Sequence, residues 1–276
     1  MPVWIWKCLP SGFHPLKFDR DDFFRDVTRN VIKKRKESGR RYNDFLQILM
    51  DAADETRHAE HLDLAEDETD RFGSIINDGL SPSLKYKKLS ETELLSQCVL
   101  FFLVGYETTA TMLTFTAYSL AVNPEWQEKL IKEVDEAFQQ HGEMSHDAVR
   151  EMKVLDAVIS ETLRMHPPLG GLERTAVENY ELRNTGIVVE KGVRVIVPVY
   201  GIHYDPEFFE DPETFNPERF LEDPKHPQYA YMPFGAGPRN CLGMRFALLE
   251  IKVCLANLLR RFRLKPHSTT KVRSHY

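Results

Sequence analysis

The sequence predicts a mainly α-helical fold with one small β element. Apolar residues recur with helical spacing along most of the chain, strand-like runs gather between residues 171 and 198, and no segment is repeated. The chain has 276 residues, of which 42% are apolar. It can therefore bury one ordinary core or two modest ones.

Composition and charge exclude several classes of protein. The formal net charge of −6 argues against a nucleic acid as partner. The four cysteines have no CxxC spacing, so neither a disulfide framework nor a zinc ribbon is expected and a reducing compartment is the default. No apolar run reaches the roughly 20 residues that span a membrane. The opening MPVWIWKCLP lacks the flanks of a signal peptide, and either a core segment or a membrane-interface contact fits it.

Two amphipathic helices are predicted near the start, over residues 19–37 and 43–53. The basic run KKRKESGRR between them could indicate a nuclear signal or an RNA contact. A solvated helix end fits it better, because no aromatic residues are interleaved with the charges. The acidic and polar residues 54–88 are expected to form a flexible linker between helices.

The longest predicted helix spans residues 89–121. Ser90 fits an N-cap with Glu93 three residues on, and Asn123 followed by Pro124 ends the pattern. About 30 helical residues make this helix on the order of 45 Å long. Because its middle is apolar nearly all round, the helix is expected to be buried.

The remaining helices are predicted after Pro124, over residues 154–168, where a proline pair ends the helix, and over residues 242–262. The last of these is expected to be long and buried. Residues 203–240 are dense in Pro, Asp and Gly and are expected to be irregular.

Four strand-like runs lie before that irregular segment. Residues 173–177 and 180–183 form the first two. The β-branched runs 187–189 and 193–199 are separated by Glu-Lys-Gly, which predicts a β-hairpin between them.

The segment FGAGPRNCLG, residues 234–243, places a cysteine behind two glycines at the start of an apolar helix. Helix N-termini carry unpaired N–H groups with partial positive charge, which favours the thiolate of Cys241, a nucleophile and a metal ligand. Gly235 and Gly237 allow the backbone to approach a flat partner closely. Arg239 can donate to an anionic group.

The residues of this loop, taken alone, allow other interpretations. A dinucleotide-binding GxGxxG fails because position 240 is Asn and no strand precedes it, and a P-loop fails because no Gly-Lys-Ser/Thr follows. For a cysteine phosphatase, Arg245 stands at the wrong spacing from the thiol. A buried structural cysteine in a tight turn remains an alternative.

Four motifs together resemble the cytochrome P-450 haem-thiolate monooxygenases, in that family's order and across almost the whole chain. FGAGPRNCLG is similar to the family's haem-binding loop, and ETLR, with Glu161 and Arg164, to its Glu-x-x-Arg motif. FNPERF supplies Arg219 as the third member of that cluster. VGYETT, residues 104–109, resembles the oxygen-activation motif. The group most resembled is the animal microsomal drug-oxidising family, which includes thromboxane synthase.

The resemblance implies haem b as cofactor. Cys241 would be the axial iron ligand, and Phe234 would shield that face of the ring or simply pack in the core. Arg174 and Arg239 would bind the haem propionates. His203 is expected to be a solvated loop residue rather than a third propionate ligand.

Glu161 and Arg164 share a helix face because they are three residues apart. With Arg219 as third partner, they are expected to form a buried cluster that is structural rather than catalytic.

The central helix carries Glu107, Thr108 and Thr109 in an otherwise apolar wall. Burying an unpaired carboxylate or hydroxyl is costly, so these side chains need a partner or a purpose. The resemblance gives Glu107 and Thr108 a catalytic role in relaying protons. Val104 stands where the family usually has alanine, and its bulk is expected to narrow the space for O₂ or substrate.

The chain resembles only the C-terminal helical part of the cytochrome P-450 fold, incomplete at both ends and without the family's membrane anchor. We expect one truncated domain over residues 1–276, with an undefined start (1–18), a haem-binding core (89–264) and a tail (265–276).

The expected function is insertion of one atom of O₂ into an apolar small molecule, with electrons from an NADPH-dependent reductase. By resemblance the protein would act at the cytosolic face of the endoplasmic reticulum membrane, with peripheral membrane contact. Arg239, Arg245 and Lys252 could help to dock the reductase. One alternative is a thromboxane-synthase-like endoperoxide isomerase, against which the Glu-Thr-Thr set argues. The other is a non-catalytic haem-binding or inactive fragment.

Overall fold

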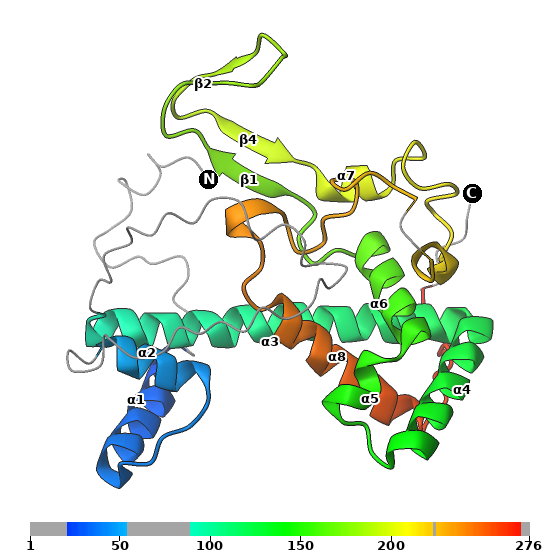
Figure 1. Cartoon of the computed structure of the whole chain (residues 1–276), viewed down its shortest axis with the longest axis horizontal. Helices are drawn as coiled ribbons and strands as arrows, with labels where there is room; N and C mark the ends of the chain where they lie inside the picture. The colour runs from blue at the N-terminus through cyan, green and yellow to red at the C-terminus, as the bar shows by residue number, and fades with distance from the viewer. Residues whose placement is uncertain (1–20, 54–88, 223–224, 272–276) are drawn as a thin grey trace. The chain divides into compact units, whose positions relative to one another are not determined.

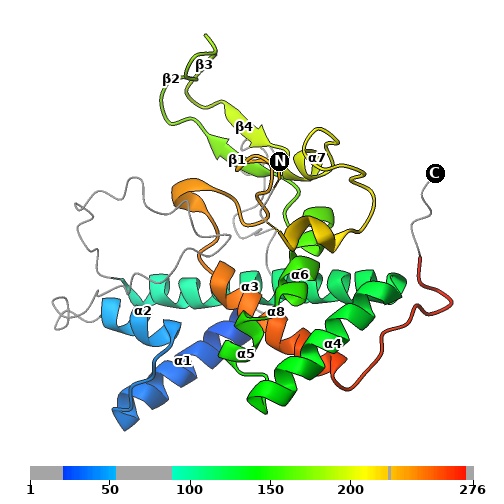
Figure 2. The same ribbon diagram turned by 45° about the vertical axis from the view of Figure 1, so that its right-hand side comes forward.

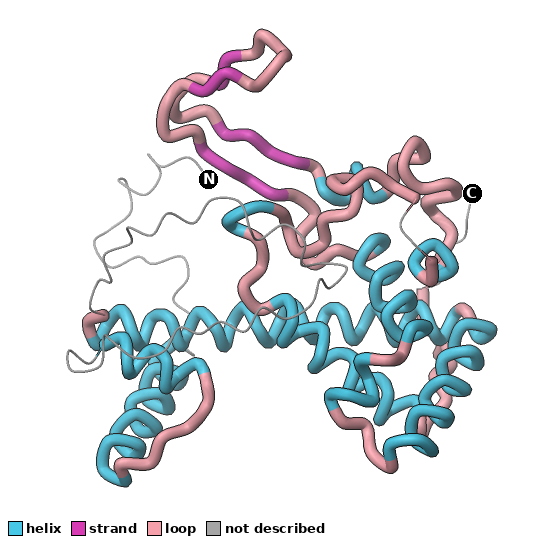
Figure 3. The backbone as a smooth tube through the Cα atoms, in the orientation of Figure 1, coloured by secondary structure: helices cyan, strands magenta, loops and turns pink. Residues whose placement is uncertain are grey.

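The computed structural model describes residues 21–53, 89–222 and 225–271. Among these residues it forms two compact units, which meet in sequence between Tyr106 and Glu107. Figure 1 shows the elements of each unit. Figure 3 shows the described strands together in magenta, and they lie within residues 172–197. The predicted mainly α fold with a small, late β element is confirmed. The predicted start (1–18) and linker (54–88) lie outside the described residues.

The first unit contains α1 (Asp21–Ser38), α2 (Phe45–Ala53) and the first half of α3 (Glu91–Val122). Both helices predicted before residue 54 are therefore confirmed. Their apolar faces meet α3 in a small core that contains Leu49, Leu94 and Cys98.

An ion pair closes the turn between α1 and α2. The Arg35 guanidinium donates to both carboxylate oxygens of Asp44, at 2.8 and 2.6 Å, and Asp44 accepts from a backbone N–H in the first turn of α2. The hydrogen bond from Arg35 is the main cause that lowers the pKa of Asp44. Arg41 pairs with Asp51 at 2.6 Å. Part of the basic run at residues 33–41 thus serves the unit's own packing.

Helix α3 begins at the predicted cap. The Glu93 N–H donates to Ser90 Oγ at 3.2 Å, and the Ser90 N–H donates to the Glu93 carboxylate at 2.9 Å, which makes a reciprocal capping box. Among the described residues, α3 is the one helix that is long and apolar enough to cross a membrane, by length and composition alone. The lengths of the uninterrupted apolar runs in the sequence predicted no such helix.

Burial changes along α3. Leu94 and Cys98 near its start and Leu120 near its end are buried, but residues 100–107 are exposed, with Tyr106 at 79%. The prediction of a helix buried along its length is wrong for this stretch. A helix that is apolar all round needs cover on every side, and the described chain covers these residues only in part, where Phe24 stacks on Phe102 and Phe45 stacks on Phe101.

The second unit packs the end of α3 with four later helices, α4 (Pro124–His141), α5 (His146–Arg150), α6 (Lys153–Met165) and α8 (Met244–Leu259). Helix α4 contacts α6 and α8, and α5 contacts α8 (Figures 1 and 2). These elements share a core whose fully buried members include Leu120, Leu130, Val134, Leu155 and Leu259. The predicted helices after Pro124 and over residues 154–168 and 242–262 are confirmed. The short α5 was not predicted.

Helix α6 is capped by a side chain of another helix. Its N-cap residue, Met152, has no side-chain acceptor. The Glu133 carboxylate of α4 takes that place, accepting from the N–H groups of Val154 at 2.8 Å and Leu155 at 2.9 Å. Burial nevertheless raises the pKa of Glu133, because the desolvation of the carboxylate outweighs these bonds.

The β element is a nested hairpin. Strand β1 (Leu172–Thr175) pairs antiparallel with β4 (Arg194–Val197), and further out β2 (Tyr180–Glu181) pairs with β3 (Val188–Val189). The predicted β-hairpin between residues 187–189 and 193–199 is wrong, because these runs pair with β2 and β1 and not with each other. A turn does form at Glu-Lys-Gly, where the Val193 N–H donates to Glu190 O at 3.1 Å. Gly192 of that turn also donates to Ala176 O at 2.8 Å and so extends the β1–β4 pairing.

The chain reverses at the tip of the hairpin, between β2 and β3. Asn184 and Gly186 have positive φ values of 61° and 69°, which both residue types tolerate. The turn therefore forms where the backbone can adopt left-handed conformations, and strand composition alone does not locate it.

Between β4 and α8 the chain is largely irregular, as predicted. It contains the short helix α7 (Val199–His203) and the 3₁₀ turns η3 (Pro217–Phe220) and η4 (Gly237–Arg239). Turn η3 packs against α6. A second small core anchors this segment, with Ala157, Phe209, Phe220 and Ala230 as its buried members.

Candidate functional site

The cysteine loop, residues 232–243, is shaped by its own backbone hydrogen bonds. The Gly235 N–H donates to Met232 O at 3.1 Å, and the Cys241 N–H donates to Phe234 O at 2.9 Å. Gly235 and Gly237 have φ values of 77° and 75°, a region that side chains other than glycine rarely adopt. The two glycines singled out in the sequence are therefore required by the backbone path of the loop.

Cys241 lies three residues before the first residue of α8 and is an exposed, free thiol. The N-cap of α8 is Gly243, which supplies no side-chain cap, so no side chain there competes for the first N–H groups of the helix. The described cysteines 98, 241 and 254 are all unpaired. Exposure removes the alternative of a buried structural cysteine.

The surroundings of the thiol combine apolar surface with a cation. Leu242 and Phe246 are 85% and 72% exposed, although both are large and apolar. Arg239 is exposed, and its guanidinium makes no hydrogen bond or ion pair with the described part of the chain. Phe234 is half-buried and packs against the main core of its unit. A thiol, exposed apolar side chains and a cation match a flat, apolar macrocycle that carries carboxylates, so the residues fit haem.

Strand β1 begins beside the cysteine loop. A Cβ added at Gly235 would lie 3.8 Å from the Leu172 side chain, which shows how closely the strand approaches. Arg174 is two residues further along β1 and so points to the same face of the strand as Leu172. It is exposed and donates to Glu173 O at 2.8 Å. The structure thus places Arg174 on a strand that contacts the loop.

Glu161 and Arg164 form a bidentate ion pair inside the protein. Arg164 Nε donates to Glu161 Oε2 at 2.7 Å and Nη2 donates to Oε1 at 2.8 Å, and neither side chain is exposed to solvent. Both residues lie on α6, three positions apart, so the helix itself aligns the two groups. Removing two charges from water costs free energy. A buried pair is therefore stable only where its geometry is good and each of its N–H donors has an acceptor.

The irregular chain after β4 completes this cluster. Arg219 Nε lies 3.4 Å from Glu161 Oε1, and the Asn216 N–H donates to the same oxygen at 2.9 Å. Arg219 also donates to Asp211 O at 3.0 Å. The structure therefore brings Glu161, Arg164 and Arg219 together, with Glu161 as the acceptor shared between α6 and η3.

His203 is not the solvated residue that its loop position predicts, since it is fully buried. Its Nδ1 lies 3.1 Å from Arg164 O, and its Nε2 lies 3.0 Å from the Met232 N–H at the start of the cysteine loop. Both ring nitrogens are engaged within the protein, so His203 is unsuited to bind a propionate. A lone histidine has no characteristic spacing, and the sequence therefore gave no signal of this contact.

The oxygen-activation motif occupies one continuous stretch of α3. Glu107 is exposed, Thr108 is half-buried and Thr109 is buried. The expectation that all three are buried polar groups is wrong for Glu107, because the described chain covers residues 100–107 only in part and leaves Glu107 exposed. The helix is unbroken here, and the space beside Gly105 is open.

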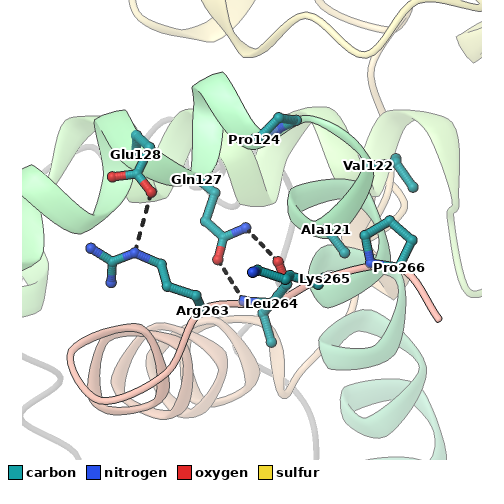
Figure 4. A pocket seen from close by; sticks show the side chains of 9 residues that line it. All are labelled: Ala121, Val122, Pro124, Gln127, Glu128, Arg263, Leu264, Lys265 and Pro266. Atoms are coloured by element: carbon teal, nitrogen blue, oxygen red, sulfur yellow. Dashed lines mark hydrogen bonds and ion pairs between the residues drawn. The ribbon is translucent and has the colours of Figure 1, made fainter.

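A surface pocket of about 510 Å³ lies elsewhere in the second unit, where the α3–α4 junction meets the chain after α8 (Figure 4). Gln127 bridges its two sides, accepting from Leu264 N at 2.7 Å and donating to Leu264 O at 3.0 Å. None of the predicted site residues lines this pocket.

Comparison with known proteins gives a consistent result. The profile of the family described as "Cytochrome P450" matches residues 39–276. Cytochrome P450 6B2 of Helicoverpa armigera is 37% identical over 254 residues, and cytochrome P450 3A11 of Mus musculus is 35% identical over 257 residues. These alignments cover 90% and 92% of this chain and 46% of each relative.

Cytochrome P450 9e2 of Blattella germanica is 38% identical over 255 residues, which are 91% of this chain and 45% of that protein. The chain thus spans about half the length of the curated relatives it matches. Because the family profile covers most of the chain, the chain belongs to the cytochrome P450 family.

Proposed function

We propose that this chain carries the haem-binding part of a haem-thiolate monooxygenase, in which the Cys241 thiolate would hold haem b. The observation that supports this best is the position of Cys241, an exposed thiol on a glycine-shaped loop immediately before α8. When bound there, haem would supply the activation of O₂, because thiolate ligation favours O–O cleavage.

The residues around the thiol would bind and orient the cofactor. Phe234, a half-buried residue of the loop, would exclude water from the sulfur side. Arg239 and Arg174, both exposed, would bind the two propionates as charge-assisted donors. The ion-pair cluster would act indirectly, by holding the chain that leads to the loop; its members are Glu161, Arg164 and Arg219.

Glu107 and Thr108 would move protons. The Glu107 carboxylate is exposed and can exchange protons with water, and the Thr108 hydroxyl on the next residue would pass them on. Val104 lies one helical turn before Thr108 and therefore shares its face. Its bulk would narrow the space beside that hydroxyl, so Val104→Ala is expected to widen the range of accepted substrates.

The substrate would be an apolar small molecule, and the electron donor an NADPH-dependent reductase at the cytosolic face of the endoplasmic reticulum membrane. Arg239 and Arg245 are exposed cations near Cys241 that would attract an acidic partner. Lys252 contributes less to this surface, because it pairs with Asp156 at 2.5 Å.

A matched pair of cysteine variants tests the proposal. Cys241 and Cys254 are both exposed free thiols, but only Cys241 lies in the glycine loop. The chain is expressed with haem precursor and reduced, and the carbon monoxide difference spectrum is recorded. We expect the red-shifted Soret band of a thiolate ligand in the wild type and in Cys254→Ser, and its loss in Cys241→Ser.

The outcomes also separate the alternatives. A thiolate-type band that persists in Cys241→Ser contradicts the assignment of the ligand. Failure of every form to take up haem favours an inactive fragment. With reductase and a panel of apolar compounds, NADPH consumption supports a monooxygenase, whereas an endoperoxide isomerase needs no reductase.

A further inference from the structure

The ring of His203 can take only one protonation state in its hydrogen bonds. Its Nδ1 faces the carbonyl oxygen of Arg164 and its Nε2 faces the N–H of Met232, at 3.1 and 3.0 Å. A carbonyl oxygen only accepts and an N–H only donates. The ring must therefore carry its proton on Nδ1 and a free lone pair on Nε2.

Met232 is the first residue of the cysteine loop, and the bonds continue from it to the cysteine. Met232 O accepts from the Gly235 N–H, and Phe234 O accepts from the Cys241 N–H. The preceding residue, Tyr231, donates its hydroxyl to Ser160 O on α6 at 2.9 Å. Two consecutive residues thus tie the start of the loop to α6, one directly and one through His203.

The contact between His203 and α6 is reciprocal. While the His203 ring donates to Arg164 O, Arg164 Nη1 donates back to His203 O at 2.9 Å. The remaining donors of Arg164 are directed at Glu161 and Thr214 O. One side chain, His203, therefore joins the buried ion-pair cluster to the loop.

We propose that His203 is a positioning residue, whose neutral, Nδ1-protonated ring bridges the last turn of α6 to Met232 and so fixes the path of the loop that carries Cys241. This inference rests on the proposed function only for the role of Cys241. The mechanical part, that the bridge orders residues 232–243, holds with or without a cofactor.

The surroundings of the ring favour the neutral form that the bridge requires. Burial is the main cause that lowers the pKa of His203 to about 4, and the charge of Arg164 acts in the same direction. The ring stacks on Tyr231, with centroids 5.4 Å apart, and meets the edge of Phe209. The titratable groups around it in the described chain include Arg164 on α6, Tyr204 next to α7, Tyr231 and His226. A phenylalanine would keep this packing but make neither bond.

The test compares three variants of the full 276-residue chain without added haem. His203→Phe removes both hydrogen bonds. His203→Gln keeps an acceptor within reach of the Met232 N–H, and His203→Asn keeps only a donor toward Arg164 O. Amide hydrogen exchange is followed in a peptide covering residues 232–243 and in a reference peptide from α4, residues 124–141.

We expect His203→Phe to speed exchange in the loop peptide about tenfold or more relative to the α4 peptide, since an unsatisfied buried N–H is costly. Glutamine should restore much of the protection and asparagine little. Equal acceleration of both peptides would overturn the proposal, since it would mark His203 as a merely structural core residue. Rescue by asparagine but not by glutamine would also overturn it.

A measurement on the wild type covers the case in which the variants do not fold. The ¹⁵N chemical shifts of the His203 ring should show protonation at Nδ1 only, unchanged between pH 8 and 6. A ring protonated at Nε2 contradicts the bridge. The Cys241→Ser variant separates the two proposals. Its thiolate band, measured with haem added, tests whether Cys241 is the ligand, and its amide exchange over residues 232–243 tests whether the His203 bridge still orders the loop.

Discussion

Two functional regions of this protein differ sharply in how much of their environment the described chain supplies. Around Glu161 the charged groups are buried or nearly so, with the Arg219 side chain 15% exposed, and the partners of Glu161 come from α6, η3 and the chain between them. Along residues 100–107 of α3, large apolar side chains face outward, with Val104 52% exposed. The first region is complete within the described residues, whereas the second is covered only in part, by Phe24 of α1 and Phe45 of α2.

The comparison separates the residues that hold the cysteine loop in place from the residues proposed to take part in the reaction. The groups that hold the cysteine loop lie in one network of hydrogen bonds and need no further chain. The groups proposed to move protons lie at the end of the exposed stretch, where Glu107 is exposed, and directly after it, where Thr108 is half-buried. The absorption spectrum of a Cys241 complex therefore tests only the region around Glu161 and the cysteine loop, whereas substrate turnover tests that region and the exposed stretch of α3 together.

The largest effect is expected inside the ion-pair cluster. Arg164→Met leaves the Glu161 carboxylate buried without its main partner, and we expect it to lower the free energy of unfolding by about 3–5 kcal/mol. Arg194→Met is the matched control, because Arg194 forms an exposed pair with Glu173 at 3.5 Å. That change should cost less than about 1 kcal/mol. Urea unfolding followed by far-UV circular dichroism measures both, and similar losses would contradict the contrast.

A second pair of variants probes the two parts of α3 with the same chemical change. Leu120 is completely buried in the core, whereas Leu100 is 49% exposed. Leu120→Ala should destabilise by about 2–5 kcal/mol, because it removes packed methyl groups and leaves a cavity. Leu100→Ala should stay within about 0.5 kcal/mol. A large loss at Leu100, measured by the same unfolding titration, would show that this stretch is covered in solution.

A smaller and graded effect is expected from pH. The pKa of His203 is lowered from 6.5 to about 4 in the folded chain. Between these two values the unfolded chain binds a proton at His203 and the folded chain does not. The contribution of His203 to stability is full above pH 6.5 and is lost as the pH falls toward 4, by at most about 1.4 kcal/mol per unit.

The measurement is the difference in unfolding free energy between wild type and His203→Gln at pH 8, 6 and 5. Glu133 contributes with the opposite sign in acid, because burial raises its pKa, and the difference between the two proteins cancels that contribution. A difference that does not shrink on acidification would contradict the buried neutral ring.

Helix positions were predictable from the sequence because their signals are local. The Ser90–Glu93 capping box, Pro124 at the start of α4 and the proline pair after α6 each act within a few residues, and the structure shows each helix where these signals place it. The contact of Glu161 with Arg164 follows in the same way from their spacing on one helix.

What could not be predicted depends on contacts between distant residues. The hairpin register is set by pairings such as Leu172 with Val197, which strand composition does not specify. His203 was missed because its partners, Arg164 and Met232, lie 39 and 29 positions away in the sequence. The exposure of Glu107 was missed because an apolar helix indicates that a covering layer is needed but not whether the described chain provides it.

The tip of the β-hairpin has a practical consequence. At the reversal, the Thr185 hydroxyl donates to Leu182 O at 2.8 Å and accepts from the Ile187 N–H at 3.1 Å, and the Leu182 N–H donates to Ile187 O at 2.9 Å. The neighbouring side chains are exposed. Exposed reversals of this kind tolerate added chain, so a fluorescent label or an affinity peptide inserted after Gly186 would report on the protein without disturbing the cysteine loop.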